Sequence, residues 1–375
     1  MKIFVQGVGA VTPLGPTARE TWDQLCQGQR APRKIMASRL GNREYYWCPV
    51  PAKFVSEAAR RPRLRRSGTV SLLGAAAGFD AFADAGLKPA PEINERTAIV
   101  FAICSGSVIY TRRLYHEIVT QGANAASPVL FPETVYNAAA SHLAALLGID
   151  ERCYTLVGDS SVGLSALHFA TELLAMQPDL DRCLVVGAEE ADWLLADAFA
   201  SWRMATTKEF FEVYGSSGGT IFAEGAAAVL IGRTGSICLS GSSAGQSFFS
   251  HRESAAVAVE FFERLHIKAA PDLIVSSANG TFADDVERVV FTRLFHSVPV
   301  YAPKPAVGEA LGASAILQVA LAGLALRHRQ IPGTLDAGSK LQTVNCQTRA
   351  HSGTDALVSC VGFNQQINAV TLQVC

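Results

Sequence analysis

Short apolar runs alternate with stretches of helical spacing along the first half of the chain. A run at residues 3–8 precedes a glycine-rich turn and then residues 18–27, where apolar positions recur every three or four residues. Residues 154–157 form a second run, followed by helical spacing at about 163–176. Two more apolar runs, expected to be strands, lie at residues 98–102 and 183–187. Strand and helix in this order predict an α/β fold.

The second half of the chain has a similar order of elements. Strands are expected at residues 225–232, 273–277, 356–361 and 369–374, the last two as a pair, and helices at residues 283–294 and 311–327. No residue-level repeat and no low-complexity linker separates the halves. We therefore predict an N-terminal half of residues 1–232 and a C-terminal half of residues 233–375, joined as one rigid body.

The composition favours burial at a subunit interface. Hydrophobic residues make up 49% of the 375 residues and charged residues 17%, which is more apolar and less charged than a typical soluble domain. We therefore expect an oligomer. The formal net charge of -1 gives no reason to expect nucleic acid or a membrane surface as the main partner, because either would favour a basic patch. Small molecules or another protein remain.

The cysteines carry no metal or disulfide signature. Nine are scattered along the chain without a CxxC pair, so we predict no metal site, no disulfide framework and a cytoplasmic location. The opening MKIFVQGVGAV has the pattern of a strand, not of a secretion signal. No segment is expected to have the length and apolarity of a membrane span.

Sequence motifs follow one another along nearly the whole chain. The first is GVGAVTPLG at residues 7–15, followed by Thr21 and Trp22. The later ones are Ser127 and Pro128 with Pro132 and Asn137, VVGAEEA at 185–191, IFAEGAAAVLIG at 221–232, SANGT at 277–281, APKPAVGEALGASA at 302–315, IPGTL at 331–335 and VGFNQQINA at 361–369. Each is a modest signal, but their shared order makes chance agreement improbable.

In this order the motifs resemble those of β-ketoacyl-carrier-protein synthases, the ketosynthases. The resemblance implies a thiolase-like fold of five layers, α-β-α-β-α, built from two similar halves. It also implies a dimer that forms across a sheet edge.

Three positions depart from this family at the site of its chemistry. Active members carry a cysteine at a strand-to-helix turn, and GDSSVG at residues 158–163 places Ser160 there. The first family histidine, in AHGT, is replaced by Asn279, and the second, in GHxLG, by Glu309. Lys304 of the same stretch is retained.

These replacements remove the groups that condensation uses. A cysteine at a helix N-terminus is partly thiolate, whereas serine has no comparable anionic fraction near neutral pH. Imidazole donors hold the developing enolate oxygen during decarboxylation of a malonyl unit, and Glu309 would oppose that charge. Asp159 makes anion stabilisation beside Ser160 less favourable still. The resemblance therefore predicts a ketosynthase-like chain without a catalytic set.

The flexible gating loop of the family also differs here. Its GFGGTN pattern appears as GFNQQIN, so Phe363 is kept while Asn364 and Gln365 stand where glycines let the backbone move. We expect a stiffer loop.

Two further groups of residues fall where ketosynthases bind their partners. Arg63, Arg65 and Arg66 lie in a dense basic run that is either a docking patch for an acidic carrier protein or a solvated loop. Phe131 and Tyr136, with residues 108–115, fall where the resemblance places the dimer edge and the floor of the acyl tunnel. Large side chains there would limit product length, and interface packing explains them equally well.

A ketosynthase-like chain without its catalytic residues resembles the chain length factors of type II polyketide systems. Such a subunit pairs with an active ketosynthase, shapes the shared acyl tunnel and sets the length of the polyketide or polyene. The resemblance implies no cofactor on this chain, because a phosphopantetheine-linked acyl group would arrive on an acyl carrier protein. Ser160 in place of the usual glutamine, GEALGASA and the compact length favour a reducing system such as aryl-polyene synthesis over an aromatic one.

Other classes of function stay open. Ser160 with Glu309 could form an acyltransferase or thioesterase pair, although no histidine is placed by spacing to activate the serine: His142, His168 and His351 match no motif. Cys104 and Cys153 could be displaced nucleophiles, but buried inert thiols are commoner. A homodimeric scaffold is the third alternative.

Overall fold

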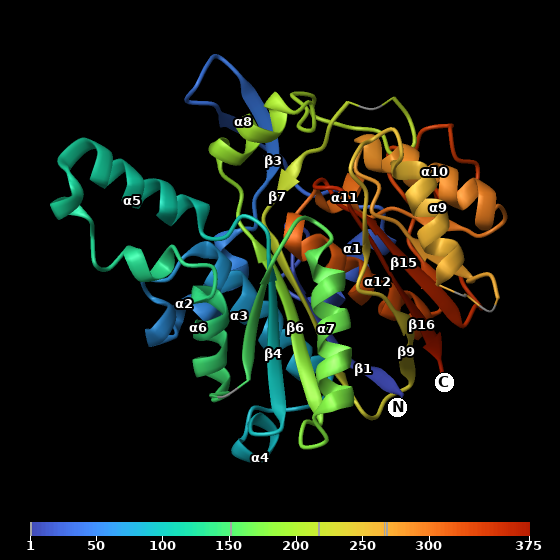
Figure 1. The fold of residues 1–375 in the computed structure, drawn as a ribbon, viewed down its shortest axis with the longest axis horizontal. Coiled ribbons are helices and arrows are strands. Elements are labelled where there is room, and N and C mark those ends of the chain that lie inside the picture. Colours follow the sequence, from blue (N-terminus) through green and yellow to red (C-terminus); the bar gives the residue numbers. More distant parts are fainter. Residues whose placement is uncertain (1, 151, 217, 266, 268) are drawn as a thin grey trace.

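One hydrogen-bonded sheet runs through the computed structural model, which describes residues 2–375 except 151, 217, 266 and 268 (Figure 1). Its strands lie in the order β12-β11-β15-β16-β9-β1-β8-β6-β4-β5, with β10 paired to β16. The bounds are β1 (Ile3–Val11), β4 (Thr97–Ile103), β5 (Cys153–Val157), β6 (Arg182–Glu189), β8 (Gly225–Gly232), β9 (Ile237–Ser242), β10 (Gln246–Ser247), β11 (Leu273–Val275), β12 (Val300–Tyr301), β15 (Asp355–Val361) and β16 (Gln366–Val374).

The two halves of the chain contribute similar parts of this sheet. In the first half β4 pairs in parallel with β5 and β6, and in the second β11 pairs in parallel with β12 and β15. Each half ends with an antiparallel strand, β8 beside β6 and β16 beside β15. Strand β1 bonds to both β8 and β9, and β9 bonds to β16, so the halves share one hydrogen-bonded body.

Helices form the layers around and between the two parts of the sheet. Helices α7 (Val162–Met176) and α12 (Ser314–His328) pack on each other, and both contact strands of the two halves. Helices α3 (Thr69–Asp84) and α6 (Ala138–Leu147) cover the outer face of the first half. Helices α9 (Ser254–Arg264) and α10 (Phe282–Leu294) form the corresponding layer of the second half. The predicted five-layer, thiolase-like α/β fold is confirmed, whereas the boundary at residues 232 and 233 stays a prediction.

The central helix α12 was expected from its apolar spacing, but one expectation about it was wrong. Residues Leu311–His328 do have the length and hydropathy of a membrane span, and 89% of this stretch is buried inside the protein. Burial by strands on both sides accounts for its apolar character, because a helix apolar on every side fits the middle layer of a soluble fold.

Strand β1 is longer than its sequence predicted. The glycines at positions 7 and 9 were expected to end it, but it continues to Val11. A Cβ atom at Gly9 would lie 2.1 Å from the carbonyl oxygen of Ala77, and one at Gly7 would lie 2.2 Å from that of Ala81. The glycines therefore let α3 approach the strand closely rather than turn the chain.

The remaining elements lie at the ends of the sheet and on its surface. They are the helices α1 (Ala18–Cys26), α2 (Ser56–Arg60), α4 (Pro91–Asn94), α5 (Val108–Gln121), α8 (Trp193–Ser201) and α11 (Lys304–Val307), and the 3-10 turns Ala52–Val55, Pro62–Leu64, Ala123–Ala125, Phe131–Glu133 and Leu311–Ala313. A small sheet contains β2 (Lys34–Ala37), β3 (Glu44–Cys48) and β7 (Phe222–Ala223), and β13 (Gln330–Ile331) pairs with β14 (Arg349–Ala350).

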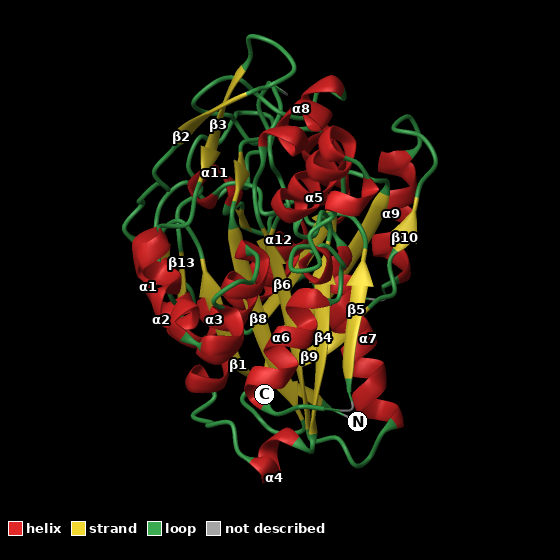
Figure 2. Cartoon of the chain, turned by 90° about the vertical axis from the view of Figure 1, so that its left-hand side faces the viewer, coloured by secondary structure: helices red, strands yellow, loops and turns green. Residues whose placement is uncertain are grey.

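Helix α5 and the chain that follows it to residue 137 stand away from the sheet, and we call this part the arm. Figure 1 shows α5 extending outward, and in Figure 2 it lies on the near face, in front of the strands. Leu114 is the buried residue of α5. Tyr115, Val119, Phe131 and Tyr136 are exposed on the arm. Because water covers so much apolar surface here, the arm has the character of an unpaired interface.

Strand β5 at the edge of the sheet has the same character. It pairs with β4 on one side, and the sheet ends there. Most of its residues are half-buried, and Val157 is exposed. An unprotected edge strand with apolar side chains is a template for pairing with another chain.

Acidic side chains fix the root of the arm to the body. The Glu190 carboxylate accepts a hydrogen bond from the Ile109 amide at 2.8 Å, and Arg112 donates to Asp192 at 2.9 Å. The second oxygen of Glu190 is buried without a hydrogen-bond partner. Burial raises the pKa of Glu190 to about 7, and the nearby Glu224 carboxylate adds to the shift, while the Ile109 amide opposes it.

The raised pKa makes the stability of the fold depend on pH. The folded protein keeps a proton on Glu190 between pH of about 4.5 and 7 that the unfolded chain releases, so stability falls as pH rises through this window. We expect Glu190→Gln to raise the free energy of unfolding by up to about 3 kcal/mol at pH 8 and by little at pH 4. Urea unfolding at both values measures this. Glu92→Gln, at an exposed position in α4, is the control, and equal effects of Glu190→Gln at both values would contradict the expectation.

Candidate functional site

Asn279 and Glu309, which the resemblance places at the family's histidines, meet in one buried network. Glu309, between α11 and the 3-10 turn that follows it, accepts hydrogen bonds from Lys304 Nζ at 2.6 Å, Asn279 Nδ2 at 2.9 Å and Ser314 Oγ at 2.7 Å. The Glu309 side chain is 0% exposed and that of Lys304 is 2% exposed. The donors that would face a substrate in an active site therefore point at a carboxylate of the protein itself.

The charges of this network compensate each other. Burial alone would lower the pKa of Lys304, but the Glu309 carboxylate outweighs it, so that pKa ends above its ordinary value. Lys304 therefore remains charged and paired at neutral pH. A buried ion pair is tolerated when its charged groups are hydrogen-bonded. The Glu309 carboxylate meets this condition through its three donors.

Local hydrogen bonds hold Asn279 in its orientation. Its Oδ1 atom accepts from Thr281 Oγ1 at 2.6 Å, which leaves Nδ2 to donate to Glu309. Asp284 accepts from the amides of Asn279 at 2.7 Å and Gly280 at 3.1 Å. Burial raises the pKa of Asp284 to about 7, against the effect of these amides. Because Gly280 has a φ of 80°, the turn favours glycine at that position.

Ser160 lies at the predicted strand-to-helix turn, between β5 and α7. It is 1% exposed, and its Oγ is buried without a hydrogen-bond partner. The Cys360 thiol contacts its backbone oxygen at 3.6 Å. Among the described residues no side chain, histidine or carboxylate, is hydrogen-bonded to Ser160 Oγ, so no base contacts this hydroxyl.

Asp159 links this turn to the gating loop. One of its oxygens accepts from the amide of Ser161 at 2.8 Å and from its hydroxyl at 2.7 Å, and the other accepts from the Asn364 amide at 3.0 Å. Ser161 Oγ also lies 2.9 Å from the amide oxygen of Gln366. Burial raises the pKa of Asp159, although these hydrogen bonds oppose the shift. The amides at the start of α7 and in the loop are thus occupied by a protein carboxylate.

The gating loop is the turn between β15 and β16, and its aromatic side chain is buried. Phe363 packs edge-on against Phe199 with 5.2 Å between ring centroids, and Phe199 packs on Phe222 at 4.9 Å. Leu311 completes this cluster, which we call the gate cluster. Phe363 is therefore packed inside the gate cluster in the conformation described.

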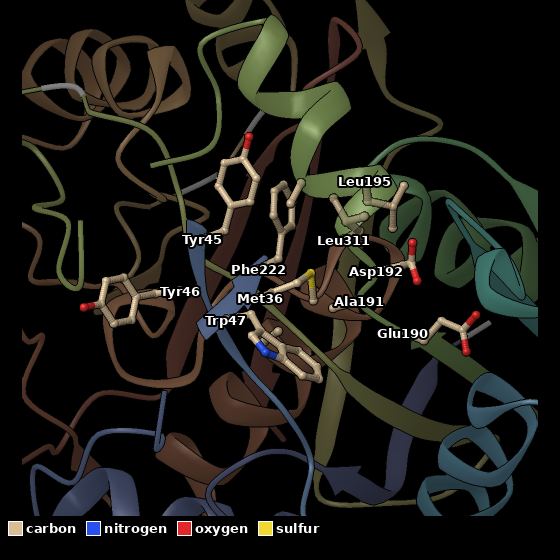
Figure 3. Close-up of a pocket in the computed structure, with 12 residues that line it drawn as sticks. Met36, Tyr45, Tyr46, Trp47, Glu190, Ala191, Asp192, Leu195, Phe222 and Leu311 are labelled. Carbon is tan, nitrogen blue, oxygen red and sulfur yellow. The ribbon is translucent and has the colours of Figure 1, made fainter. Parts of the chain in front are cut away.

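A cavity next to the gate cluster is almost filled by side chains. Phe222 and Leu311 line it together with Met36, Trp47 and Leu195 (Figure 3). Its volume is about 10 Å³, which is room for about one water molecule. This cavity cannot hold an acyl chain in the conformation described.

The alternative nucleophiles are held in unreactive states. Cys104 packs against the gate cluster, where burial first and then the Glu189 and Asp159 carboxylates raise its pKa far above the ordinary value. Burial raises the pKa of Cys153 to about 11. Thiols of this kind carry little thiolate near neutral pH.

The histidines outside the motifs lie apart from Ser160. His142 contacts Glu133 at 2.8 Å, and His168 contacts Ser242 at 3.0 Å. His351 directly follows β14, and burial lowers its pKa, with the charges of Asp272 and Arg349 nearby.

The structure brings together some of the predicted site residues and leaves others on the surface. Asn279, Lys304 and Glu309 are joined by hydrogen bonds, Ser160 contacts Cys360, and Phe363 lies in the gate cluster. Phe131 and Tyr136 belong to the arm, and the arginines at 63, 65 and 66 are exposed beside its root. That Ser160, Asn279, Lys304 and Glu309 take no part in catalysis stays a prediction.

The comparisons with known proteins agree with this geometry. The Beta-ketoacyl synthase N-terminal domain matches residues 1–235, and the C-terminal domain matches residues 235–337. The chain belongs to the β-ketoacyl synthase family. A curated relative, 3-oxoacyl-[acyl-carrier-protein] synthase 2 of Vibrio cholerae, is 26% identical over 213 residues, which cover 55% of this chain and 50% of the relative. The chain thus matches about half the length of this relative.

Solved structures of the family share the entire fold. The ishigamide ketosynthase/chain length factor superposes with a TM-score of 0.86 at 17% identity, over 100% of this chain and 99% of that one. The complex of a ketosynthase (ApeO) with its chain length factor (ApeC) from Xenorhabdus doucetiae gives a TM-score of 0.82 at 19% identity, over 100% and 98% of the two chains. At these identities the likeness establishes the fold.

Sequence reasoning missed the side chains that hold the site closed. Ser314 and Gln366 were not singled out, and Asp159 was noted only for its charge. The sequence offered one signal, a carboxylate directly before the serine of the turn, but its partner Asn364 is 205 residues away.

The central ion pair generates a first prediction for this site. Glu309→Gln leaves the charged Lys304 buried without a counter-charge, so we expect a loss of about 3–5 kcal/mol in the free energy of unfolding. The double variant Lys304→Met with Glu309→Gln removes the charge as well and should recover part of that loss. Asp181→Asn breaks a more exposed ion pair with the same 2.6 Å separation, to Arg96, and should cost less than about 1 kcal/mol. Equal losses in chemical unfolding for Asp181→Asn and Glu309→Gln would contradict the role of burial.

The contact between Asp159 and the gating loop generates a second prediction. Asp159→Ala removes three hydrogen bonds, and we expect amide hydrogen exchange of residues 362–366 to become about 10- to 100-fold faster, corresponding to about 1–3 kcal/mol. Mass-spectrometric exchange with peptide resolution measures this. Asp150→Ala, at an exposed position, should leave the loop unchanged. Unchanged protection in Asp159→Ala would mean that packing of Phe363 alone holds the loop.

Proposed function

We propose that this chain is a non-catalytic ketosynthase-like subunit, a chain length factor that forms a heterodimer with an active β-ketoacyl synthase. The observation that carries the proposal is the closed network around Glu309. Its carboxylate takes the donors Lys304, Asn279 and Ser314, so these groups face Glu309 and not an enolate oxygen. A negative charge in this position would oppose decarboxylation instead of promoting it.

The arm and the edge strand β5 are the surfaces that would meet the ketosynthase. Both expose apolar side chains that the isolated chain leaves in water, including Val119, Phe131 and Val157. Covering such surface is the main driving force for stable subunit association. The solved ketosynthase and chain length factor complexes of the same fold support a partner of this class.

Within the heterodimer this subunit would form part of the wall of the partner's acyl tunnel. Its own cavity beside the gate cluster is too small for a chain, so the growing chain would lie in the partner. Phe131 and Tyr136, exposed on the arm, would then limit how far that chain extends. Product length would follow from the size of these side chains.

The acyl groups would arrive on a carrier protein, so this subunit would need no cofactor of its own. Arg63, Arg65 and Arg66 are exposed, and the ion pairs that the structure describes include none of them. A cluster of free guanidinium groups suits an acidic carrier and its phosphopantetheine phosphate. A cytoplasmic, reducing pathway of the aryl-polyene type is the setting we propose.

One observation favours a second candidate, an acyltransferase or thioesterase that uses Ser160. The unpartnered Ser160 Oγ lies at the start of α7, where a helix N-terminus favours a developing negative charge. Against this candidate stand its burial and the absence of a neighbouring base among the described residues.

Co-expression with a ketosynthase encoded in the same genome tests the proposal. We expect native mass spectrometry to show a one-to-one heterodimer, whose product formation requires the nucleophile of the ketosynthase and is unchanged by Ser160→Ala. Ser160→Cys alone should give no malonyl decarboxylation, because the enolate still lacks donors.

Two results would overturn this assignment. A stable homodimer that is labelled by a p-nitrophenyl acyl ester, with labelling abolished in Ser160→Ala, would establish the second candidate. Malonyl decarboxylation by Ser160→Cys would show that the network around Glu309 does support condensation chemistry.

A further inference from the structure

The outer part of the arm presents apolar side chains with little regular structure to hold them. Residues 127–137 contain one 3-10 turn, Phe131–Glu133, and expose Val129, Phe131, Val135 and Tyr136. The hydrogen bonds within this segment join residues that are close in sequence. An example is the bond from the Thr134 hydroxyl to the Phe131 backbone oxygen, at 2.7 Å. Local bonds fix the shape of the turn but not its place on the molecule.

The Glu133 side chain ties this segment to the body. Glu133 is buried, at 8% exposure, between the exposed Pro132 and the half-buried Thr134. One carboxylate oxygen lies 2.8 Å from His142 Nε2 in α6, and the other accepts a hydrogen bond from the Gly68 amide at 3.2 Å. Among the side-chain hydrogen bonds of the described residues 127–137, those of Glu133 are the ones that leave the segment.

The Gly68 contact connects the 3-10 turn to the chain that carries Arg63, Arg65 and Arg66, which we call the arginine segment. Gly68 comes directly after Arg65, Arg66 and Ser67. From the other side, the Tyr110 hydroxyl of α5 donates to the backbone oxygen of Arg66 at 3.1 Å. The arm therefore holds the backbone that carries the arginines through two contacts, one from Tyr110 and one from Glu133.

Apolar packing accompanies the polar anchor of Glu133: Leu130 is buried beside Phe131, and Tyr136 packs near the end of the segment. The Tyr136 ring lies against Gly106, where a Cβ atom would be 3.0 Å away, and Gly106 has a φ of 71°. This contact holds the far end of the segment at the root of α5. Phe131 lies nearer along the chain to Glu133 than to Tyr136.

We infer that Glu133 is a positioning residue that fixes where Phe131 meets the acyl tunnel of the partner, by anchoring the 3-10 turn to His142 and to the arginine segment at Gly68. This inference rests on the proposed function. It adds a specific determinant of product length that does not itself touch the acyl chain. It also links the surface that would bind the carrier to the wall that would limit the chain.

The chemistry of the anchor predicts how substitutions behave. Alanine at position 133 removes both acceptor oxygens, so the Gly68 amide and His142 lose their partner and the turn is free to shift. Glutamine keeps the shape and one acceptor oxygen, so it should retain most of the positioning. Glu57→Ala, in exposed α2, removes a carboxylate near the arginine segment without such contacts and is the matched control.

The test compares product lengths made by purified heterodimers at equal heterodimer content, measured by native mass spectrometry. We expect Glu133→Ala to change the ratio of the two most abundant product lengths at least threefold, and Glu133→Gln and Glu57→Ala to leave it within about 1.5-fold. Phe131→Ala should change the ratio in the same direction. Combining Glu133→Ala with Phe131→Ala should add little, because the anchor acts through that ring.

Each outcome separates the inference from the proposed function. A changed ratio in Phe131→Ala with an unchanged ratio in Glu133→Ala, or full additivity of the two, would overturn the role of Glu133 alone. If no heterodimer forms, or if Phe131→Ala has no effect on product length, the result contradicts the proposed function, on which the role of Glu133 rests. Where Glu133→Ala does not assemble, His142→Ala removes one half of the anchor: a shift in the same direction supports the inference, and an unchanged ratio overturns it.

Discussion

The ion pair between Lys304 and Glu309 lies where the layers of the fold meet, with both side chains out of water. Glu309 also bonds through its backbone to Ile221 and Ala223 on either side of Phe222, so the same residue connects α11 to the small sheet and to the gate cluster. Ser314, another partner of Glu309, begins α12. Removing one charge would leave the other buried and unpaired, which would strongly lower the free energy of unfolding.

Under the proposed function, this arrangement is a former reactive site that has become structural while the fold is kept. An active condensing site needs polar groups that face a substrate and are only partly satisfied by the protein. Here Asn279, Lys304 and Glu309 satisfy one another, and Asp159 occupies the amides that lie near Ser160. A fully satisfied buried network makes the interior rigid, while a partly satisfied one costs stability.

The surface has the opposite character. The arm and strand β5 expose apolar side chains that the interior of the same chain would bury, and the root of the arm depends on acids such as Glu190 whose protonation changes near neutral pH. A buried centre with paired polar groups, together with an arm and an edge strand that expose apolar side chains, suits a subunit that acts through a partner. Glu133 lies at the boundary, since it belongs to the arm but is buried against the body.

The sequence by itself determined many strands and helices of the core, because apolar spacing reports which face of an element is buried, but α3, α6, α9 and β9 were not among the expected elements. Collinear motifs also predicted that Ser160, Asn279 and Glu309 stand at the positions of the family's cysteine and histidines. The sequence failed where one contact between distant segments decided the outcome. The continuation of β1 past Gly7 depends on how closely α3 approaches, and the bond of Asp159 to Asn364 joins residues 205 positions apart. The exposure of the arm and the anchoring of Glu133 to Gly68 were likewise decided by the tertiary structure, because packing, and not local pattern, sets which buried polar groups find partners.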